Sequence, residues 1–155
     1  MILVAHGEEP PEPAREKTIR RPGERARAHN AAMKTRFTPA EANRTLPLVK
    51  RIVADILERG RDLRAAVESA GGDPGYEDER RITRIENELR ELMRELENIG
   101  CYYKDWGFEM GLVDFPAQID GQDVFLCWRS DEDKVEWYHT HEAGYAGRQP
   151  IPEDA

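Results

Sequence analysis

The chain has 155 residues, 35% of them charged and 39% apolar, and a formal net charge of −8, which fits one soluble domain with a modest core. It has no apolar run near the roughly 20 residues of a membrane helix and no basic segment before its short apolar start, so we expect a cytoplasmic protein with no membrane partner. Its two cysteines form no C-x-x-C pair, which argues against a disulfide framework and against a thiolate zinc site, and we expect both to be buried.

The N-terminal stretch differs in composition from the rest of the chain. Residues 1–35 are rich in Pro, Arg and Glu and lack apolar periodicity, which predicts a disordered basic extension, either a tail or an over-long gene start. Residues 1–36 hold eight Lys and Arg against five Glu, so the remainder of the chain is strongly acidic. An acidic body repels phosphate backbones, and we expect no nucleic-acid partner.

The working domain is expected over residues 36–152, and a long helix is predicted at its start. Thr38 suits the N-cap, Pro39 the first helical position and Glu41 a capping box, while Pro47 predicts a kink. A seam with heptad spacing follows before the glycines at 71–75. Its positions are Leu46, Val49, Val53, Ile56, Gly60, Leu63, Val67 and Ala70.

A second helix is predicted from about Glu77 to Ile99, with Gly100 as its C-terminal residue. Its apolar stripe repeats the three–four spacing, so the two helices are expected to form a coiled-coil-like antiparallel hairpin. The first helix is longer, and residues 38–47 should therefore project beyond the second helix, toward whatever follows Gly100. Two helices alone leave apolar flanks exposed, which suggests a homodimer through the hairpin.

A three-stranded antiparallel meander is predicted after the helices, which makes the fold class α+β. Alternating residues flank Asp120-Gly121, the favoured type I′ pair, and this turn sets Phe115 opposite Leu126. A four-residue turn at 130–133 would then place Trp137 opposite Leu126 on the apolar face. On the other face the same register predicts one row of Asp114, Cys127 and Glu136.

The last strand ends in an H-x-H-E cluster. His139 and His141 would lie on one side of a strand, where Glu142 or Asp114 could complete a site for a divalent transition metal. In the alternative interpretation, His139 ends the apolar row beside Val124 and hydrogen-bonds a backbone carbonyl.

Several further residues are candidates for chemistry or binding. Asp114 and Glu136 could act as a general acid–base pair, and Cys127 as a nucleophile if a histidine lies close. The glycine-rich return at 144–150 brings Arg148, which either binds an anion or pairs with Glu41 or Asp114.

Three stretches resemble the bacterial and archaeal family DUF2203: FTPAEANRTLP at 37–47, GLVDFPAQIDGQDVFLCW at 111–128 and HTHEAGYAGRQPI at 139–151. The resemblance implies family membership over about residues 36–152 and no activity. The family pattern matches Glu41, Asn43, Arg44, Asp114, Pro116, Cys127, Trp128, His139, Glu142, Gly147, Arg148 and Gln149. Tyr138 stands where the family commonly has Trp, and His141 is particular to this chain, which favours His139 in any metal site.

Three functions are compatible with the sequence. The first is a self-associating binding or scaffold module without catalysis. The second is a small metal-dependent enzyme, hydrolase-like, with His139, Glu142 and Asp114 as ligands and Glu41 or Glu136 as base. The third is a binder of an anionic small molecule, with Arg44 and Arg148 as the charged contacts and Asn43 and Gln149 beside them.

Overall fold

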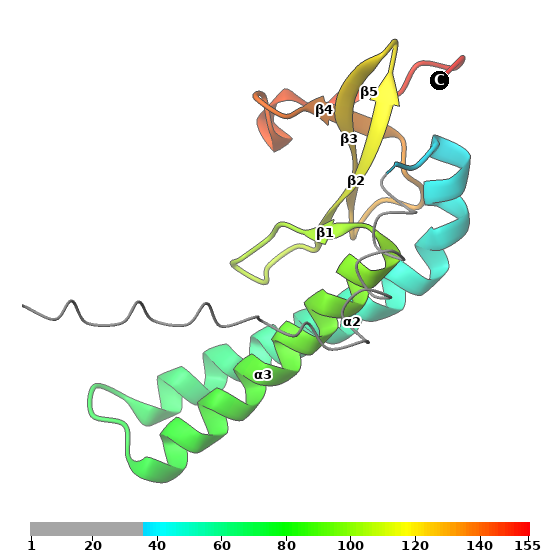
Figure 1. Ribbon diagram of the computed structural model, residues 1–155. Coiled ribbons are helices and arrows are strands. Elements are labelled where there is room, and N and C mark those ends of the chain that lie inside the picture. Colours follow the sequence, from blue (N-terminus) through cyan, green and yellow to red (C-terminus); the bar gives the residue numbers. More distant parts are fainter. Residues whose placement is uncertain (1–35) are drawn as a thin grey trace, which may run out of the picture.

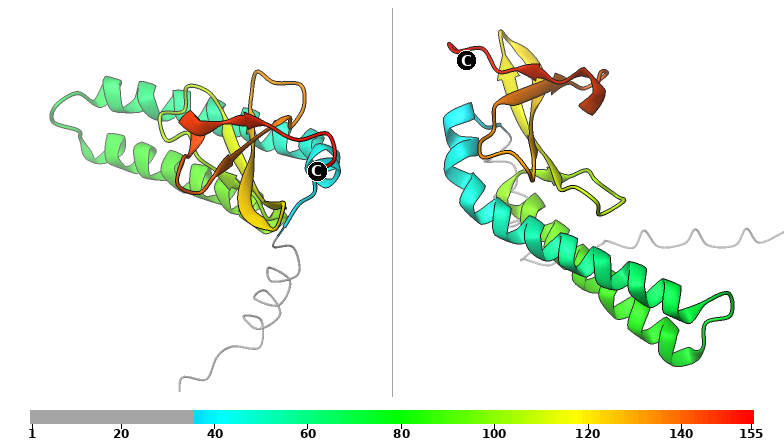
Figure 2. Two further views of the ribbon diagram at one scale, coloured as in Figure 1. Left: turned by 90° about the horizontal axis from the view of Figure 1, so that it is seen from above. Right: turned by 180° about the vertical axis from the view of Figure 1, so that it is seen from behind.

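A computed structural model describes residues 36–155, which form a helical hairpin and one antiparallel sheet, an α+β fold (Figure 1). Helix α2 spans Pro39–Ala70, beginning at the predicted residue, and the Thr38 hydroxyl accepts the Glu41 backbone N–H at 3.2 Å. The helix continues through Pro47, and its first turns are inclined to the remainder (Figure 2). The extension expected over residues 1–35 lies outside the described residues.

The predicted seam of α2 is buried over most of its length. Its positions from Leu46 to Gly60 are buried and Leu63 is half-buried, as expected. Val67 is instead 50% exposed, and the neighbouring Ala66 is buried in its place. The helix therefore uses the predicted face near the sheet and departs from it toward the far end.

Helix α3 spans Tyr76–Ile99 and runs antiparallel to α2. It ends as predicted at Gly100, which adopts a φ of 109° and donates its N–H to the Leu96 and Glu97 carbonyls. The α3 residues of the core are buried Ile85, Leu89 and Leu96, with Ile82, Leu92, Met93 and Ile99 partly buried. No helix of residues 36–155 is long and apolar enough to cross a membrane.

The sheet has five strands in the order β1-β2-β3-β4-β5, so the predicted number of three was wrong. The strands are β1 Tyr102–Tyr103, β2 Leu112–Ile119, β3 Gln122–Arg129, β4 Trp137–Thr140 and β5 Gln149–Pro150. The two additional strands extend the edges of the meander and have two residues each, too few to show an alternating pattern.

The register between β2 and β3 confirms the prediction. Phe115 lies opposite Leu126, and Asp120 and Gly121 take φ values of 52° and 78°, both positive as a type I′ turn requires.

The register between β3 and β4 was predicted one residue wrong. Trp137 lies opposite Cys127, not Leu126, and β4 begins only at Trp137. Just before β4 the chain contacts the helix instead: the Asn43 side chain bonds both the N–H of Val135, at 2.8 Å, and its C=O, at 3.1 Å. Val135 is therefore paired with α2 instead of β3, and every following residue changes face.

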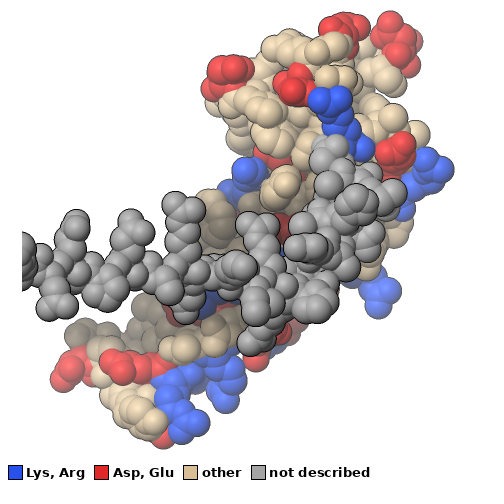
Figure 3. Space-filling view, viewed as in Figure 1, with Lys and Arg blue, Asp and Glu red and all other residues tan. Residues whose placement is uncertain are grey.

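The sheet covers the open end of the hairpin, over the N-terminal half of α2 (Figures 1 and 2). Its inner face and the helices share one core, in which the largest fully buried side chains are Trp128, Phe115, Ile56, Leu96, Leu126, Val49, Val53, Val113 and Val124. The far half of the hairpin, toward the turn at 71–75, extends away from the sheet (Figure 1). Acidic and basic side chains are both visible on the uncovered part of the hairpin in Figure 3, and Arg59 lies within ion-pair distance of Glu58, Asp62 and Glu88.

The loop between β1 and β2 is anchored on the helix. Phe108 adopts a φ of 53°, an uncommon conformation for a bulky residue, and its side chain contacts the bare backbone of Gly60 in α2. The Asp105 carboxylate accepts three backbone N–H groups of the same loop, those of Gly107, Glu109 and Met110.

Candidate metal centre

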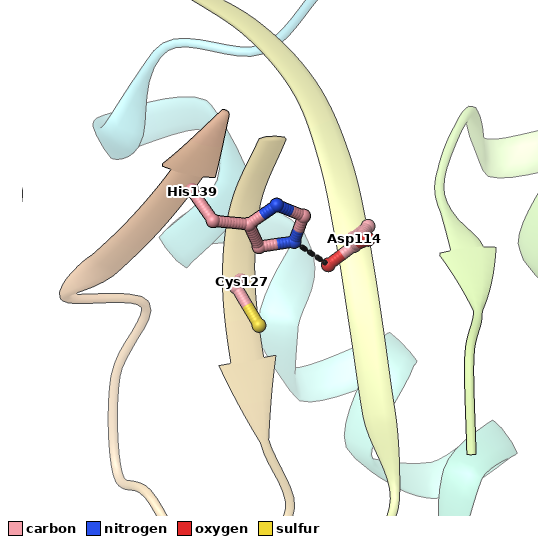
Figure 4. A group of neighbouring side chains, drawn as sticks. All are labelled: Asp114, Cys127 and His139. Atoms are coloured by element: carbon pink, nitrogen blue, oxygen red, sulfur yellow. Dashed lines mark hydrogen bonds and ion pairs between the residues drawn. The ribbon is translucent and has the colours of Figure 1, made fainter. Parts of the chain in front are cut away.

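Asp114, Cys127 and His139 meet on the outer face of the sheet, away from the helices (Figure 4). They come from the middle of three adjacent strands, β2, β3 and β4. Asp114 is the direct partner of Cys127, and His139 follows on β4 beside Phe125. Each side chain can offer one ligand atom, and these atoms lie within 4.8 Å of one another.

The three residues are among the least exposed polar groups described. Their exposed fractions are 5% for Asp114, 1% for Cys127 and 4% for His139. Burying an ionisable group without a partner costs several kcal/mol, so buried charges in proteins are paired or bind metals. The cluster is therefore either a hydrogen-bonded group or a ligand set.

The hydrogen bonds of His139 define its tautomer. Nδ1 lies 2.8 Å from the Thr140 carbonyl oxygen, which can only accept, so Nδ1 carries a proton. Nε2 lies 3.1 Å from Asp114 Oδ1. Metal-binding histidines commonly donate one ring N–H to a carbonyl and coordinate through the other nitrogen, and His139 has this arrangement.

The donor set fits a small transition-metal ion. One thiolate, one imidazole and one carboxylate are all common ligands of Zn²⁺, with bond lengths near 2.0–2.3 Å. Tetrahedral ligands at these lengths are separated by about 3.3–3.8 Å, so a cluster within 4.8 Å needs only small side-chain rotations to close around an ion. Three protein ligands leave a fourth position open.

The Cys127 thiol is protonated in the metal-free protein. Its pKa is raised to about 12, mainly by burial and also by the carboxylate of Asp114, while the Arg148 guanidinium acts to lower it. A thiol of this kind is a poor nucleophile at neutral pH, because the thiolate is the reactive form. A coordinated metal ion would deprotonate it, so the geometry favours Cys127 as a ligand over the nucleophile considered from the sequence.

Arg148 supports the cluster from one side. Its Nη2 donates to Glu132 Oε2 at 2.7 Å and to the Cys127 carbonyl at 3.2 Å, while its guanidinium lies 5.2 Å from the ring centroids of Trp137 and Tyr145. The partners expected from the sequence, Glu41 and Asp114, were wrong. Arg148 is thus used within the protein and fixes the C-terminal return on β3.

Two other predicted ligand-binding residues also have structural contacts. Asn43 uses its amide on Val135 and Pro39, and Gln149 Oε1 accepts the Tyr138 hydroxyl at 3.2 Å. Arg44 is exposed on the first turns of α2. The anion site expected from Arg44 and Arg148 stays a prediction.

The remaining candidates lie apart from the buried cluster. Glu41, Glu136 and Glu142 are exposed, and the shifted register puts Trp137 in the row where Glu136 was predicted. The same shift places His139 on the outer face, whereas the sequence had placed it beside Val124 on the inner face. Its predicted bond to a backbone carbonyl is confirmed.

Some residues around the cluster were not singled out from the sequence. Glu132 accepts the Arg129 backbone N–H at 2.9 Å in addition to Arg148, and Trp137 stacks under the same guanidinium. Glu132 stands in a loop, where no periodicity marks a functional position. Trp137 was expected in the core, because the predicted register gave it the inner face.

Comparison with known proteins matches the chain to one family model. The model of the family described as an uncharacterized conserved protein, DUF2203, matches residues 35–151. No curated protein and no solved structure matches the chain.

Proposed function

The chain belongs to the DUF2203 family, and we propose that it binds a divalent transition-metal ion through Asp114, Cys127 and His139. The observation that carries the proposal is the buried convergence of these three ligand types, with their donor atoms within 4.8 Å. The sequence suggested His139, Glu142 and Asp114 as ligands, and the proposed set has Cys127 in place of Glu142.

Charge balance also supports a metal ion at this position. Without metal, the bond between His139 Nε2 and Asp114 Oδ1 requires one proton between these two atoms, so the two groups together are neutral and lie beside a neutral thiol. With metal, a neutral imidazole, a thiolate and a carboxylate surround a doubly charged ion. The net charge of the buried site is zero in both states, so the exchange of two protons for M²⁺ leaves no uncompensated charge inside the sheet.

The test is a metal titration of the full-length protein after treatment with chelator and reductant. We expect one Zn²⁺ or Co²⁺ per chain, and Co²⁺ should produce the near-ultraviolet charge-transfer band of a thiolate ligand. The substitutions Cys127→Ser, His139→Ala and Asp114→Asn should each weaken binding at least tenfold, since each removes a ligand. Saturating metal should raise the melting temperature, because an ion that binds only the folded state stabilises it.

Two substitutions provide matched controls. Cys101→Ser changes the other buried thiol, and His141→Ala changes an exposed histidine of the same strand end, so both should retain full binding. Circular dichroism should confirm that each variant is folded. The proposal fails if the folded wild-type protein binds no metal and shows no thiolate–Co²⁺ band.

A metal-dependent enzyme is an extension of this proposal. Catalytic zinc sites have three protein ligands and keep one position for water or substrate, and the Asp114–Cys127–His139 cluster offers three. The bases suggested from the sequence, Glu41 and Glu136, are not part of the cluster. Self-association through a coiled-coil-like hairpin stays a prediction, and its seam is largely occupied by packing within the hairpin.

A further inference from the structure

A pocket of about 510 Å³ opens beside the candidate metal centre, over strands β1, β2 and β3. Its volume lies within the range of small-molecule sites, about 300–1,000 Å³. The lining residues that matter for recognition are Arg36, Tyr102, Lys104, Asp123, Phe125 and His141. None of them belongs to the proposed metal ligands.

Aromatic rings line one part of this pocket. The rings of Phe125 and His141 stack with centroids 4.3 Å apart and an interplanar angle of 15°. Tyr102 contributes a third ring and is 42% exposed. Aromatic side chains favour planar ligands, because stacked rings gain roughly 0.5–1.5 kcal/mol beyond the burial of their area.

The ammonium of Lys104 gives the pocket its charge. Its Nζ lies 5.9 Å from the centroid of Tyr102 and 5.7 Å from that of Phe125, so the cation is held over ring faces, and no ion pair joins it to a carboxylate of residues 36–155. Arg36 is paired with Asp123 at 3.3 Å. The charged lining therefore has one positive charge in excess, on a protein whose net charge is −8.

We propose that this pocket binds a planar aromatic carboxylic acid. The ring would lie on the surface formed by Phe125, His141 and Tyr102, and the carboxylate would meet the Lys104 ammonium. A monoanion matches the single excess charge, whereas a phosphate ester carries about two negative charges and would leave one unpaired.

The position of the pocket connects it to the candidate metal centre. Phe125 is the cross-strand partner of His139, with ring centroids 5.7 Å apart, and Tyr102 is the partner of Asp114. A bound acid would thus lie next to the cluster on the same face of the sheet. Binding of the acid uses none of the three metal ligands and is expected to occur without metal.

The test uses 2-naphthoate and its neutral analogue 2-naphthamide in calorimetric titrations of the full-length protein. We expect naphthoate to bind and the amide to bind about two- to fivefold more weakly, because only the acid pairs with the ammonium. Lys104→Gln should weaken naphthoate binding by about the same factor and leave the affinity for the amide unchanged. Lys134→Gln, another exposed lysine but outside the pocket, is the matched control and should bind as the wild type does.

Two further variants keep the result interpretable. Phe125→Leu should weaken binding of the acid and of the amide to the same extent, because it removes an aromatic ring from the pocket but no charge. Cys127→Ser should retain naphthoate binding even when it has lost metal, so failure of the metal site would not be mistaken for failure of the pocket. Absence of naphthoate binding at millimolar concentration, equal affinity for the amide, or an unchanged affinity in Lys104→Gln would overturn the proposal.

Discussion

The guanidinium of Arg148 holds the C-terminal return by contacts that a lysine could not reproduce. It is planar, so it can lie against Trp137 and Tyr145 while its Nη2 reaches both Glu132 and the Cys127 carbonyl. The side chain is only 11% exposed, and that of Glu132 is 16% exposed. Screening by water is therefore weaker here than for the exposed ion pairs of the helices.

The Cys101 thiol should make stability depend on alkaline pH. Burial raises its pKa to about 12, whereas in the unfolded chain it titrates near the ordinary value of 9.0. The unfolded state therefore loses its proton first, and stability is intact below pH 9 and falls above it, by about 1.4 kcal/mol per pH unit for one thiol. Urea unfolding at several pH values should show this decline in the wild type and less of it in Cys101→Ala. Parallel curves for the two proteins would refute the assignment.

The candidate site was only partly predictable from individual residues. Asp114 and Cys127 could be paired from the sequence, because a two-residue turn fixes the register of the strands it joins. His139 could not be added to them, since its face depends on where β4 begins, and just before that point Val135 bonds Asn43 of α2 instead of β3. Two residues 92 positions apart leave no local signal.

At the scale of elements, two glycines allow the closest approaches to α2. A methyl group at Gly60 would lie 2.4 Å from the Phe108 Cβ, and one at Gly111 would lie 2.3 Å from a methyl carbon of Val53. Both distances are far shorter than ordinary contacts between carbon atoms, near 3.5–4.0 Å. The loop and the sheet therefore pack against this helix at two positions, Gly60 and Gly111, where the absence of a side chain allows the close contact.

Gly60→Ala should destabilise the protein by about 1–3 kcal/mol, the usual cost of overpacking, although alanine favours helix at an exposed site. Gly72→Ala is the control, because a methyl group there meets nothing within 4 Å. Denaturant unfolding measures both. The cost at Gly60 should shrink in a Phe108→Gly background, which removes the opposing side chain and also suits the φ of 53°. Additive effects of the two changes would show that the steric account is wrong.

The elements themselves were largely predictable, for reasons that differ between helix and strand. The ends of α2 and α3 carry local chemistry, namely Thr38-Pro39 at one start and Gly100 at one end. The edge strands β1 and β5 pair over two residues each, so only their position beside β2 and β4 makes them strands. Trp137 and Tyr138 are both aromatic, and alternation alone could not decide which of them faces the core.

For the molecule as a whole, the side chain of Asn43 links the helical hairpin to the sheet region by hydrogen bonds. Its amide bonds both backbone groups of Val135, and the Val135 side chain is buried. Asn43→Ala should therefore cost about 3 kcal/mol, roughly 1 kcal/mol for each of the three hydrogen bonds lost, two with Val135 and one with the Pro39 carbonyl. Asn87→Ala removes an exposed side-chain bond to Arg90 on α3 and should change the free energy of unfolding by less than about 0.5 kcal/mol. Equal effects in the two variants would contradict this role of Asn43.

The hydrogen bonds between Asn43 and Val135 also bear on the order in which the chain folds. The helical hairpin and the β2–β3–β4 meander are each built from neighbours in sequence, so each can form early through short loop closures. The bond between Asn43 and Val135 closes a segment of 92 residues and can form only when both halves exist. Docking of the two halves is therefore a late step of folding, and it buries the Val135 side chain between them.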